Sequence, residues 1–313
     1  MQNKIAIIDL GTNTFHLLIA EGDSRGFNIM YRERLAVKIG QGGINQDIIT
    51  DEGLHRALVA MQSFKNTIDQ QNIRAVYAFG TSALRNARNG FEIARKIQAV
   101  TGIDVNIISG EQEAEFIYLG AKSALDMGTE YNLVMDIGGG SVEFILANND
   151  RVFWKESFEI GAQRLLERFQ KNDPIVLTEI QALNQYFDDA LKPLFDAMDR
   201  YPPTVLVGSS GTFDTLSDIF CIKHDIHKSP EEIETPLSIA GFYEIYEELL
   251  VKNRAERMLI PGMIEMRVDM IVVASCLIRY LIENHTFERI RVSTYSLKEG
   301  VLAHLSSTVG STI

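Results

Sequence analysis

The sequence is poor in cysteine, with only Cys221 and Cys276 among its 313 residues. Two cysteines this far apart form neither a disulfide framework nor a paired-cysteine zinc site. We therefore expect both thiols to be buried as small hydrophobic groups in a reducing, cytoplasmic environment. The six histidines are dispersed, and none is spaced as a pair of metal ligands. These absences argue against a zinc enzyme and against a histidine-based phosphotransferase.

Long apolar runs are also missing. No segment approaches the roughly 18 uninterrupted apolar residues that a membrane helix needs. The sequence from Met1 to Asp9 resembles a strand. Its short apolar run is followed by Asp9 and Gly11, without the small-residue cleavage site of a secretory signal. We expect a cytoplasmic protein that does not bind membranes.

Positive charge is scarce, since 42 acidic residues outnumber 30 lysines and arginines and give a net charge of -12. A chain this acidic should not attract polyanions through a general electrostatic field, which argues against binding nucleic acid. Any phosphate site must be local, built from backbone N–H groups, a metal ion and a few arginines. The chain also lacks a Gly-x-x-x-x-Gly-Lys-Ser/Thr stretch, so a P-loop nucleotidase is disfavoured.

Strand-like and helix-like segments alternate along the chain, which predicts an α/β fold. A length of 313 residues fits two domains of about 100–200 residues each. The predicted strands are 4–9, 15–20, 27–36, 75–80, 104–109, 132–136, 142–147, 152–160, 205–207 and 289–293. The main predicted helices begin near Thr50 and then cover 82–100, 111–125, 161–170, 178–198, 213–220 and 297–306.

An internal repeat relates the two halves. When Asp9 is aligned with Asp136, Gly11 meets Gly138, Thr14 meets Ser141, and residues 18–20 meet 145–147. Each half therefore opens with a strand, a polar turn and a second strand. The repeat predicts duplicated domains that face an interdomain cleft.

The clearest candidate for binding chemistry is the loop from Asp136 to Glu143. Its glycines, Gly138, Gly139 and Gly140, remove every Cβ, so that backbone N–H groups can close on phosphate oxygens. Ser141 adds a hydroxyl donor, and Asp136 and Glu143 are hard oxygen ligands suited to Mg²⁺. The alternative is a simple glycine-rich hairpin with two solvated acids.

Two further loops are candidate phosphate sites. Thr12, Asn13 and Thr14 follow Asp9 and offer neutral hydroxyl and amide donors. The segment Ser209-Ser210-Gly211-Thr212 lies between a strand and a helix, where a helix N-terminus can bind an anion. The alternative for this second loop is a tight turn capped by Ser210 or Thr212.

Arg85 and the acids of residues 109–115 supply the remaining candidates. Arg85 lies early in a predicted helix, where it can clamp a phosphate, although a surface position is an equal alternative. An acid at the start of the helix after Ser109 can act as a general base that orients a water. Capping by Ser109 and interaction with the helix dipole are the alternative.

Taken together, these segments resemble the exopolyphosphatase and guanosine pentaphosphate phosphohydrolase family, within the actin–Hsp70–sugar kinase superfold. The resemblance spans essentially the whole chain and adds the motif 296–300 to the segments above. It implies two ribonuclease H-like, actin-like ATPase domains, residues 1–124 and 125–297, with the helix 298–313 packing back on the first. It also implies a Mg²⁺-dependent hydrolase of inorganic polyphosphate or guanosine pentaphosphate, and a homodimer.

Carried over by position, Glu113 resembles the catalytic base and Arg85 a phosphate clamp. Asp9, Asp136 and Glu143 resemble the metal-binding carboxylates, and the three loops resemble phosphate cradles. The sequence departs from the family pattern at Gln112, where a second glutamate is common; we expect the lost charge to alter the pKa of the base or the metal affinity. A small-molecule kinase of the same superfold and a non-catalytic alarmone sensor are the alternatives.

Overall fold

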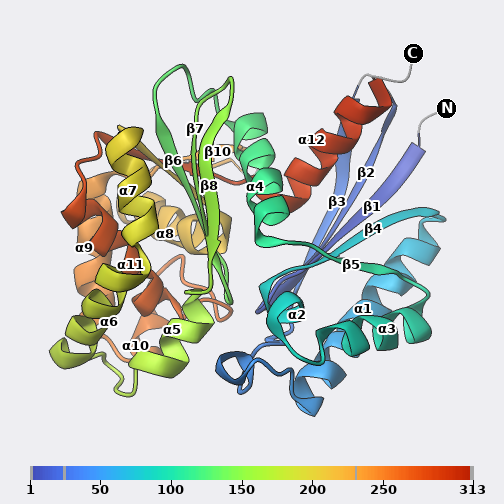
Figure 1. Cartoon of the computed structure of the whole chain (residues 1–313), viewed down its shortest axis with the longest axis horizontal. Helices are drawn as coiled ribbons and strands as arrows, with labels where there is room; N and C mark the ends of the chain where they lie inside the picture. Colours follow the sequence, from blue (N-terminus) through green and yellow to red (C-terminus); the bar gives the residue numbers. More distant parts are fainter. Residues whose placement is uncertain (1–2, 24–25, 230, 311–313) are drawn as a thin grey trace. The chain divides into compact units, whose positions relative to one another are not determined.

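A computed structural model of the protein describes residues 3–23, 26–229 and 231–310. These residues divide into two compact units (Figure 1). Unit 1 runs to Gly120 and resumes at Leu297, and unit 2 is Ala121–Ser296. The sequence placed the two boundaries at 124/125 and 297/298, and residues 311–313 of the predicted last helix lie outside the described part of the chain.

Unit 1 contains one mixed sheet of five strands in the order β3-β2-β1-β4-β5 (Figure 1). The first three strands pair antiparallel, whereas β4 runs parallel to β1 and β5 parallel to β4. The strands are β1 Asn3–Leu10, β2 Thr14–Asp23, β3 Gly26–Ala36, β4 Ala75–Gly80 and β5 Val105–Ile107. The helical elements are η1 Ile44–Gln46, α1 Asp51–Gln70, α2 Ser82–Asn86, α3 Gly90–Thr101, α4 Gly110–Ala124 and α12 Leu297–Gly310. The end of α4, from Ala121 on, belongs to unit 2.

Local sequence explains the start and the packing of α1. Thr50 is its N-cap, and the Thr50 hydroxyl accepts a hydrogen bond from the Gly53 N–H at 3.1 Å. Met61, Phe64 and Ile68 recur at helical spacing and are buried in the core of unit 1. Burial of this apolar stripe, rather than helix propensity, fixes the position of α1.

The prediction of a single helix over 82–100 is wrong. This segment forms two helices, α2 and α3, with a non-helical connection between them. Ala87 adopts an extended conformation, and the Asn89 side-chain amide bonds to the backbone N–H and C=O of Ile49 at 3.0 and 2.8 Å. Gly90 passes so close to the Leu84 carbonyl that a Cβ there would lie 1.9 Å from its oxygen. These tertiary contacts outweigh the helical spacing of the apolar residues.

Unit 2 contains a six-stranded sheet in the order β10-β11-β9-β6-β7-β8. The strands are β6 Asn132–Ile137, β7 Val142–Ala147, β8 Val152–Phe158, β9 Val205–Ser209, β10 Glu234–Thr235 and β11 Arg289–Ser293. The helices are α5 Ala162–Phe169, α6 Leu177–Ala190, α7 Lys192–Arg200, α8 Ser210–Lys223, α9 Ile239–Val251, α10 Arg254–Arg257 and α11 Ile271–Asn284. The helix predicted over 178–198 is divided at Leu191, and Pro193 lies in the first turn of α7.

The two sheets repeat one topology, which confirms the predicted pair of ribonuclease H-like α/β folds. Strands β6, β7 and β8 form an antiparallel meander like β1, β2 and β3, and β9 runs parallel to β6 as β4 runs parallel to β1. In the paired registers Asp9 faces His16, and Asp136 faces Glu143. The duplicated hairpins therefore differ in chemistry at the same position.

Both cysteines are buried, as predicted. Burial raises the pKa of the Cys276 thiol to about 11 and also raises the pKa of Cys221. Both sulfurs therefore stay protonated near neutral pH and are unreactive. Within the described ranges, no helix is long and apolar enough to span a bilayer.

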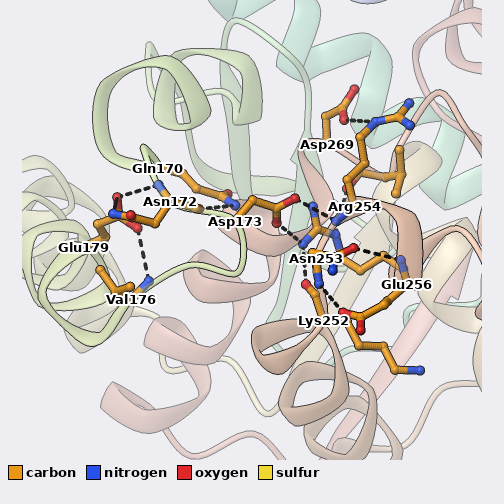
Figure 2. A network of polar contacts seen from close by, with 12 residues as sticks. Gln170, Asn172, Asp173, Val176, Glu179, Lys252, Asn253, Arg254, Glu256 and Asp269 are labelled. Carbon is orange, nitrogen blue, oxygen red and sulfur yellow. Dashed lines mark hydrogen bonds and ion pairs between the residues drawn. The ribbon is translucent and has the colours of Figure 1, made fainter.

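A network of polar contacts in unit 2 joins the segment after α5 to the segment after α9 (Figure 2). The Glu179 carboxylate accepts hydrogen bonds from the backbone N–H groups of Lys171, Asn172 and Val176 at 2.7, 3.0 and 3.1 Å. Burial alone would raise the pKa of Glu179, but these hydrogen bonds outweigh it and the pKa is lowered. The ionised carboxylate of Glu179 therefore holds the turn before α6 in place.

Arg257 forms the other side of this network and is only 2% exposed. Its guanidinium donates to Asp173 Oδ1 at 2.6 Å and to the carbonyl oxygens of Lys252 and Val268 at 2.6 and 3.1 Å. Asp173 also accepts from the Arg254 N–H at 2.7 Å (Figure 2). The buried Arg257 thus links the Asp173 side chain to the backbone at Lys252 and Val268.

Candidate functional site

The glycine-rich turn of unit 2 connects β6 to β7 and packs on the start of α5. The carbonyl oxygens of Gly138, Gly139 and Gly140 accept hydrogen bonds from the N–H groups of Ala162, Gln163 and Gly161 at 2.9, 2.9 and 3.0 Å. In a trans peptide the C=O and the next N–H point in opposite directions. The N–H groups of residues 139, 140 and 141 therefore point away from α5, side by side, as in an anion-binding nest.

Gly161 and Arg164 hold this turn in place and were not found from the sequence. A Cβ at Gly161 would lie 2.4 Å from the carbonyl carbon and oxygen of Gly139. Arg164, buried in α5, donates from Nε to the Gly140 carbonyl at 3.0 Å. The only local signal is a glycine at a helix start with an arginine three residues later. This signal alone does not predict a contact with the glycine-rich turn.

Replacement of Gly161 by alanine tests this close approach. We expect Gly161→Ala to lower the free energy of unfolding by about 1–3 kcal/mol, because the turn and α5 must separate, and to raise the KM for a phosphate substrate. Urea unfolding and steady-state kinetics measure the two effects. Gly102→Ala is the control, since Gly102 has a φ of +72° at the end of α3 and should lose stability without a change in KM. Wild-type stability and KM in Gly161→Ala would show that the turn tolerates a side chain.

The two carboxylates that flank the turn lie on the same face of the sheet. Asp136 and Glu143 are directly opposed in the β6–β7 register, so their Cβ atoms are about 4.5–5.5 Å apart. Glu143 is 1% exposed and accepts a hydrogen bond from the Ser157 hydroxyl at 2.6 Å. Ser157, on β8, is a further residue that the sequence did not single out.

The loop at the end of β9 meets the same aspartate. The hydroxyls of Ser209 and Ser210 lie 3.2 and 2.6 Å from Asp136 Oδ2, and both are donors to it. Ser210 begins α8 in the left-handed region, with a φ of +68°. In this arrangement the two hydroxyls orient the carboxylate, and the loop offers an anion its backbone N–H groups at the start of α8.

Gly211 makes room for an arginine at the start of α8. A Cβ on Gly211 would lie 2.1 Å from a terminal guanidinium nitrogen of Arg267, so the planar group lies directly on this glycine. Arg267 precedes Val268, whose carbonyl is bonded to the buried Arg257 described above. Sequence reasoning missed Arg267 because 56 residues separate it from Gly211.

In unit 1 the turn from β1 to β2 carries Thr12, Asn13 and Thr14, each of which is at most 6% exposed. The segment after β3 packs behind this turn. The Asn13 carbonyl accepts from the N–H groups of Val37 and Lys38 at 2.9 and 2.8 Å, and the Thr12 carbonyl accepts from Gly40 at 3.2 Å. As in unit 2, the carbonyls are held by a neighbouring segment, and the hydroxyl, amide and N–H groups of the turn are the candidate donors to a ligand.

Arg85 and Glu113 lie together in unit 1, at the ends of β4 and β5. Arg85 is in α2, directly after β4, and Glu113 is in the first turn of α4. The guanidinium donates to Glu113 Oε2 at 2.6 Å and to the Ile108 carbonyl at 3.3 Å. Glu113 is 7% exposed. The structure thus brings together the two residues predicted as clamp and base, and Arg85 is not a surface residue.

Gln112, where the sequence departs from the family pattern, caps α4. Its side-chain oxygen accepts from the Ser109 N–H at 3.2 Å, and the Ser109 hydroxyl accepts from the Gln112 N–H at 3.1 Å. This reciprocal pair is a capping box, which glutamine and glutamate both form. The capping role expected of Ser109 and the predicted role of Glu113 as a base are therefore compatible. Ser109 and Gln112 cap the helix, and Glu113 takes no part in the capping box.

A comparison with protein-family models matches residues 18–308 to the Ppx/GppA phosphatase family. The chain belongs to this family. The matched range covers the sheet of unit 2 with its glycine-rich turn, the Arg85–Glu113 pair, and the sheet of unit 1 except β1 and the start of β2. Four of the predicted site residues lie just ahead of it: Asp9, Thr12, Asn13 and Thr14.

Individual relatives agree with the membership. The chain is 42% identical to an exopolyphosphatase from Cytophaga hutchinsonii ATCC 33406, with a TM-score of 0.95, over 99% of this chain and 100% of the other. A family member from Aquifex aeolicus has a TM-score of 0.80 over 98% and 99% of the two chains, and at 22% identity it supports the fold alone. A guanosine-5'-triphosphate,3'-diphosphate pyrophosphatase from Pseudoalteromonas translucida (strain TAC 125) is 28% identical over 96% of this chain. The chain spans 59% of the length of that relative.

This Ppx/GppA family chain contains no cluster of three acidic, histidine or cysteine side chains ready to hold a metal within residues 3–23, 26–229 and 231–310. Mg²⁺ does not require one, because it usually keeps several waters and takes only one or two carboxylates. Asp136 and Glu143, two opposed hard-oxygen ligands beside an anion nest, fit that requirement. Asp9 occupies the equivalent strand position in unit 1, opposite His16.

Proposed function

We propose that the protein is a Mg²⁺-dependent phosphohydrolase that removes the terminal phosphate from inorganic polyphosphate or guanosine pentaphosphate. The observation that supports this proposal most is the buried Arg85–Glu113 pair, since it joins a phosphate clamp to a carboxylate base in a family of phosphatases. The two named relatives, an exopolyphosphatase and a guanosine pentaphosphate pyrophosphatase, support the two substrate classes.

The chain's residues divide between binding and proton transfer. In unit 2 the N–H groups of residues 139–141, and in unit 1 the donors of Thr12, Asn13 and Thr14, bind phosphate oxygens. Arg85 neutralises charge on the phosphate with its planar guanidinium. Hydrogen-bond donors and an arginine bound to phosphate oxygens stabilise the charge that develops on these oxygens in the transition state.

Glu113 orients a water for in-line attack on the terminal phosphorus and accepts its proton. The new bond joins the water oxygen to phosphorus, and the bond from phosphorus to the bridging oxygen breaks. The products are inorganic phosphate and a chain shortened by one phosphate. Arg85 fixes the direction of the Glu113 carboxylate through the 2.6 Å hydrogen bond.

Asp136 and Glu143 would hold Mg²⁺, with Asp9 as the third predicted ligand. When bound, the ion supplies charge neutralisation for the phosphate oxygens. Ser157, Ser209 and Ser210 orient these carboxylates through their hydroxyls, a supporting role that is common around metal ligands.

Phosphate release across a substrate panel tests the proposed function. The panel contains short and long polyphosphate, guanosine pentaphosphate and ATP, each with and without Mg²⁺. We expect Mg²⁺-dependent release of inorganic phosphate from polyphosphate, guanosine pentaphosphate or both, without an acceptor. ADP formation that requires an added acceptor would instead identify a kinase, and tight binding without release would identify a sensor. Light scattering on the same preparation measures whether the predicted homodimer forms.

A further inference from the structure

The phosphate-binding turn of unit 1 has only neutral donors. Thr12, Asn13 and Thr14 offer two hydroxyls, one amide and their N–H groups. A terminal phosphate carries more than one negative charge, so a cation beside this turn would strengthen binding. The segment that packs behind the turn contains one basic residue, Lys38.

Lys38 has an unusual backbone conformation. Its φ is +47°, in the left-handed region that most side chains avoid. Within the described chain, the other non-glycine residues in this region have short polar side chains that tolerate it; they are Asp47, Asn72, Ser210 and Asp225. Lys38 is the single long side chain in the group. A glycine would be less strained there, and a strained backbone at a long charged side chain is a reason to ask what that side chain does.

Several hydrogen bonds impose this conformation. The Lys38 N–H donates to the Asn13 carbonyl at 2.8 Å. The Lys38 carbonyl accepts from the Arg56 guanidinium at 2.7 Å, and the Val37 carbonyl accepts from Arg56 Nε at 2.6 Å. Gly40 packs against Thr12 so closely that a Cβ would lie 2.6 Å from its methyl carbon. The backbone of Lys38 is therefore fixed to the turn on both sides.

We propose that Lys38 is a substrate-binding residue, whose ammonium binds a phosphate of the substrate beside Thr12, Asn13 and Thr14. The Lys38 side chain is half-buried, and the Lys38 backbone N–H is bonded directly to the Asn13 carbonyl. The four-carbon stem of lysine is long enough for the ammonium to extend along the turn. The inference rests on the proposed function and deepens it by adding a cation beside a turn whose own donors are neutral. Because the contact exists before and during the reaction, it lowers KM and leaves kcat nearly unchanged.

Lys38→Gly separates a binding role from a structural one. Glycine relieves the strained φ, so the melting temperature should equal or exceed that of the wild type. We expect the KM for polyphosphate in Mg²⁺ to rise about tenfold or more, as for loss of one charge-assisted hydrogen bond, with kcat within about twofold. The variant should also show a weaker dependence of KM on salt. Lys38→Arg should restore most of the affinity, because it keeps the charge.

Asn72→Gly is the matched control, since Asn72 has a φ of +55° after α1 and should change melting temperature without changing KM. A second readout is calorimetric binding of inorganic tripolyphosphate to Glu113→Gln, with and without Lys38→Gly. Unchanged KM and unchanged binding in the Lys38→Gly proteins would overturn the inference. A wild-type protein that releases no phosphate from any substrate would instead overturn the proposed function, and the calorimetric comparison would still decide whether Lys38 binds phosphate.

Discussion

Glu113→Gln is expected to lower kcat for phosphate release by about 10²–10⁴-fold, the range for loss of a general base. The amide has the size of the carboxylate and keeps an oxygen that accepts the hydrogen bond from Arg85, so the fold and the substrate KM should change little. The reason for the large effect is chemical, because a neutral amide cannot take the proton of the attacking water. Phosphate release under saturating substrate measures kcat, and thermal melting checks the fold.

Glu111→Gln is the control for this variant. Glu111 lies in the same first turn of α4 but is exposed, so its removal changes the helix-dipole interaction without removing the base. We expect its kcat to stay within about twofold of the wild type. Near-normal turnover in Glu113→Gln, or an equal loss in both variants, would contradict the assignment of Glu113 as the base.

Glu143→Gln is expected to raise the Mg²⁺ concentration for half-maximal activity by at least about tenfold. The substitution keeps the volume of a side chain that is 1% exposed and leaves an oxygen for the Ser157 hydroxyl, so the turn should keep its shape. It removes one of two opposed negative charges, which weakens the attraction for a divalent cation. A Mg²⁺ titration of phosphate release at saturating substrate measures the shift.

A second measurement does not depend on turnover. Mg²⁺ should raise the melting temperature of the wild-type protein through linkage, and this stabilisation should shrink in Glu143→Gln. Glu130→Gln is the control, since Glu130 is an exposed acid that pairs with Arg289 at 2.7 Å. If Glu143→Gln and the wild type gave the same metal titration and the same Mg²⁺-induced stabilisation, Glu143 would not be a metal ligand.

Features that depend on neighbouring residues were predictable from the sequence. The glycine run between Asp136 and Glu143 encodes a turn that exposes N–H groups, and the alternation of elements encodes two sheets of one topology. Features that depend on contacts between segments far apart in the sequence could not be predicted. Gly161, Arg164 and Arg267 act on residues 21 to 56 positions away, and the Asn89 contacts with Ile49 break a helix whose apolar spacing is uninterrupted. No periodicity encodes such contacts.

The bonds between the glycine-rich turn and α5 also bear on transplanting this turn into another protein. A graft of residues 136–143 alone would carry the glycines but not the three N–H groups that occupy their carbonyls. Without these partners the peptide groups of the glycines could rotate, and the N–H groups of residues 139–141 would no longer point in one direction. The smallest transferable module therefore has two separate pieces, the turn and the helix start with its glycine and buried arginine.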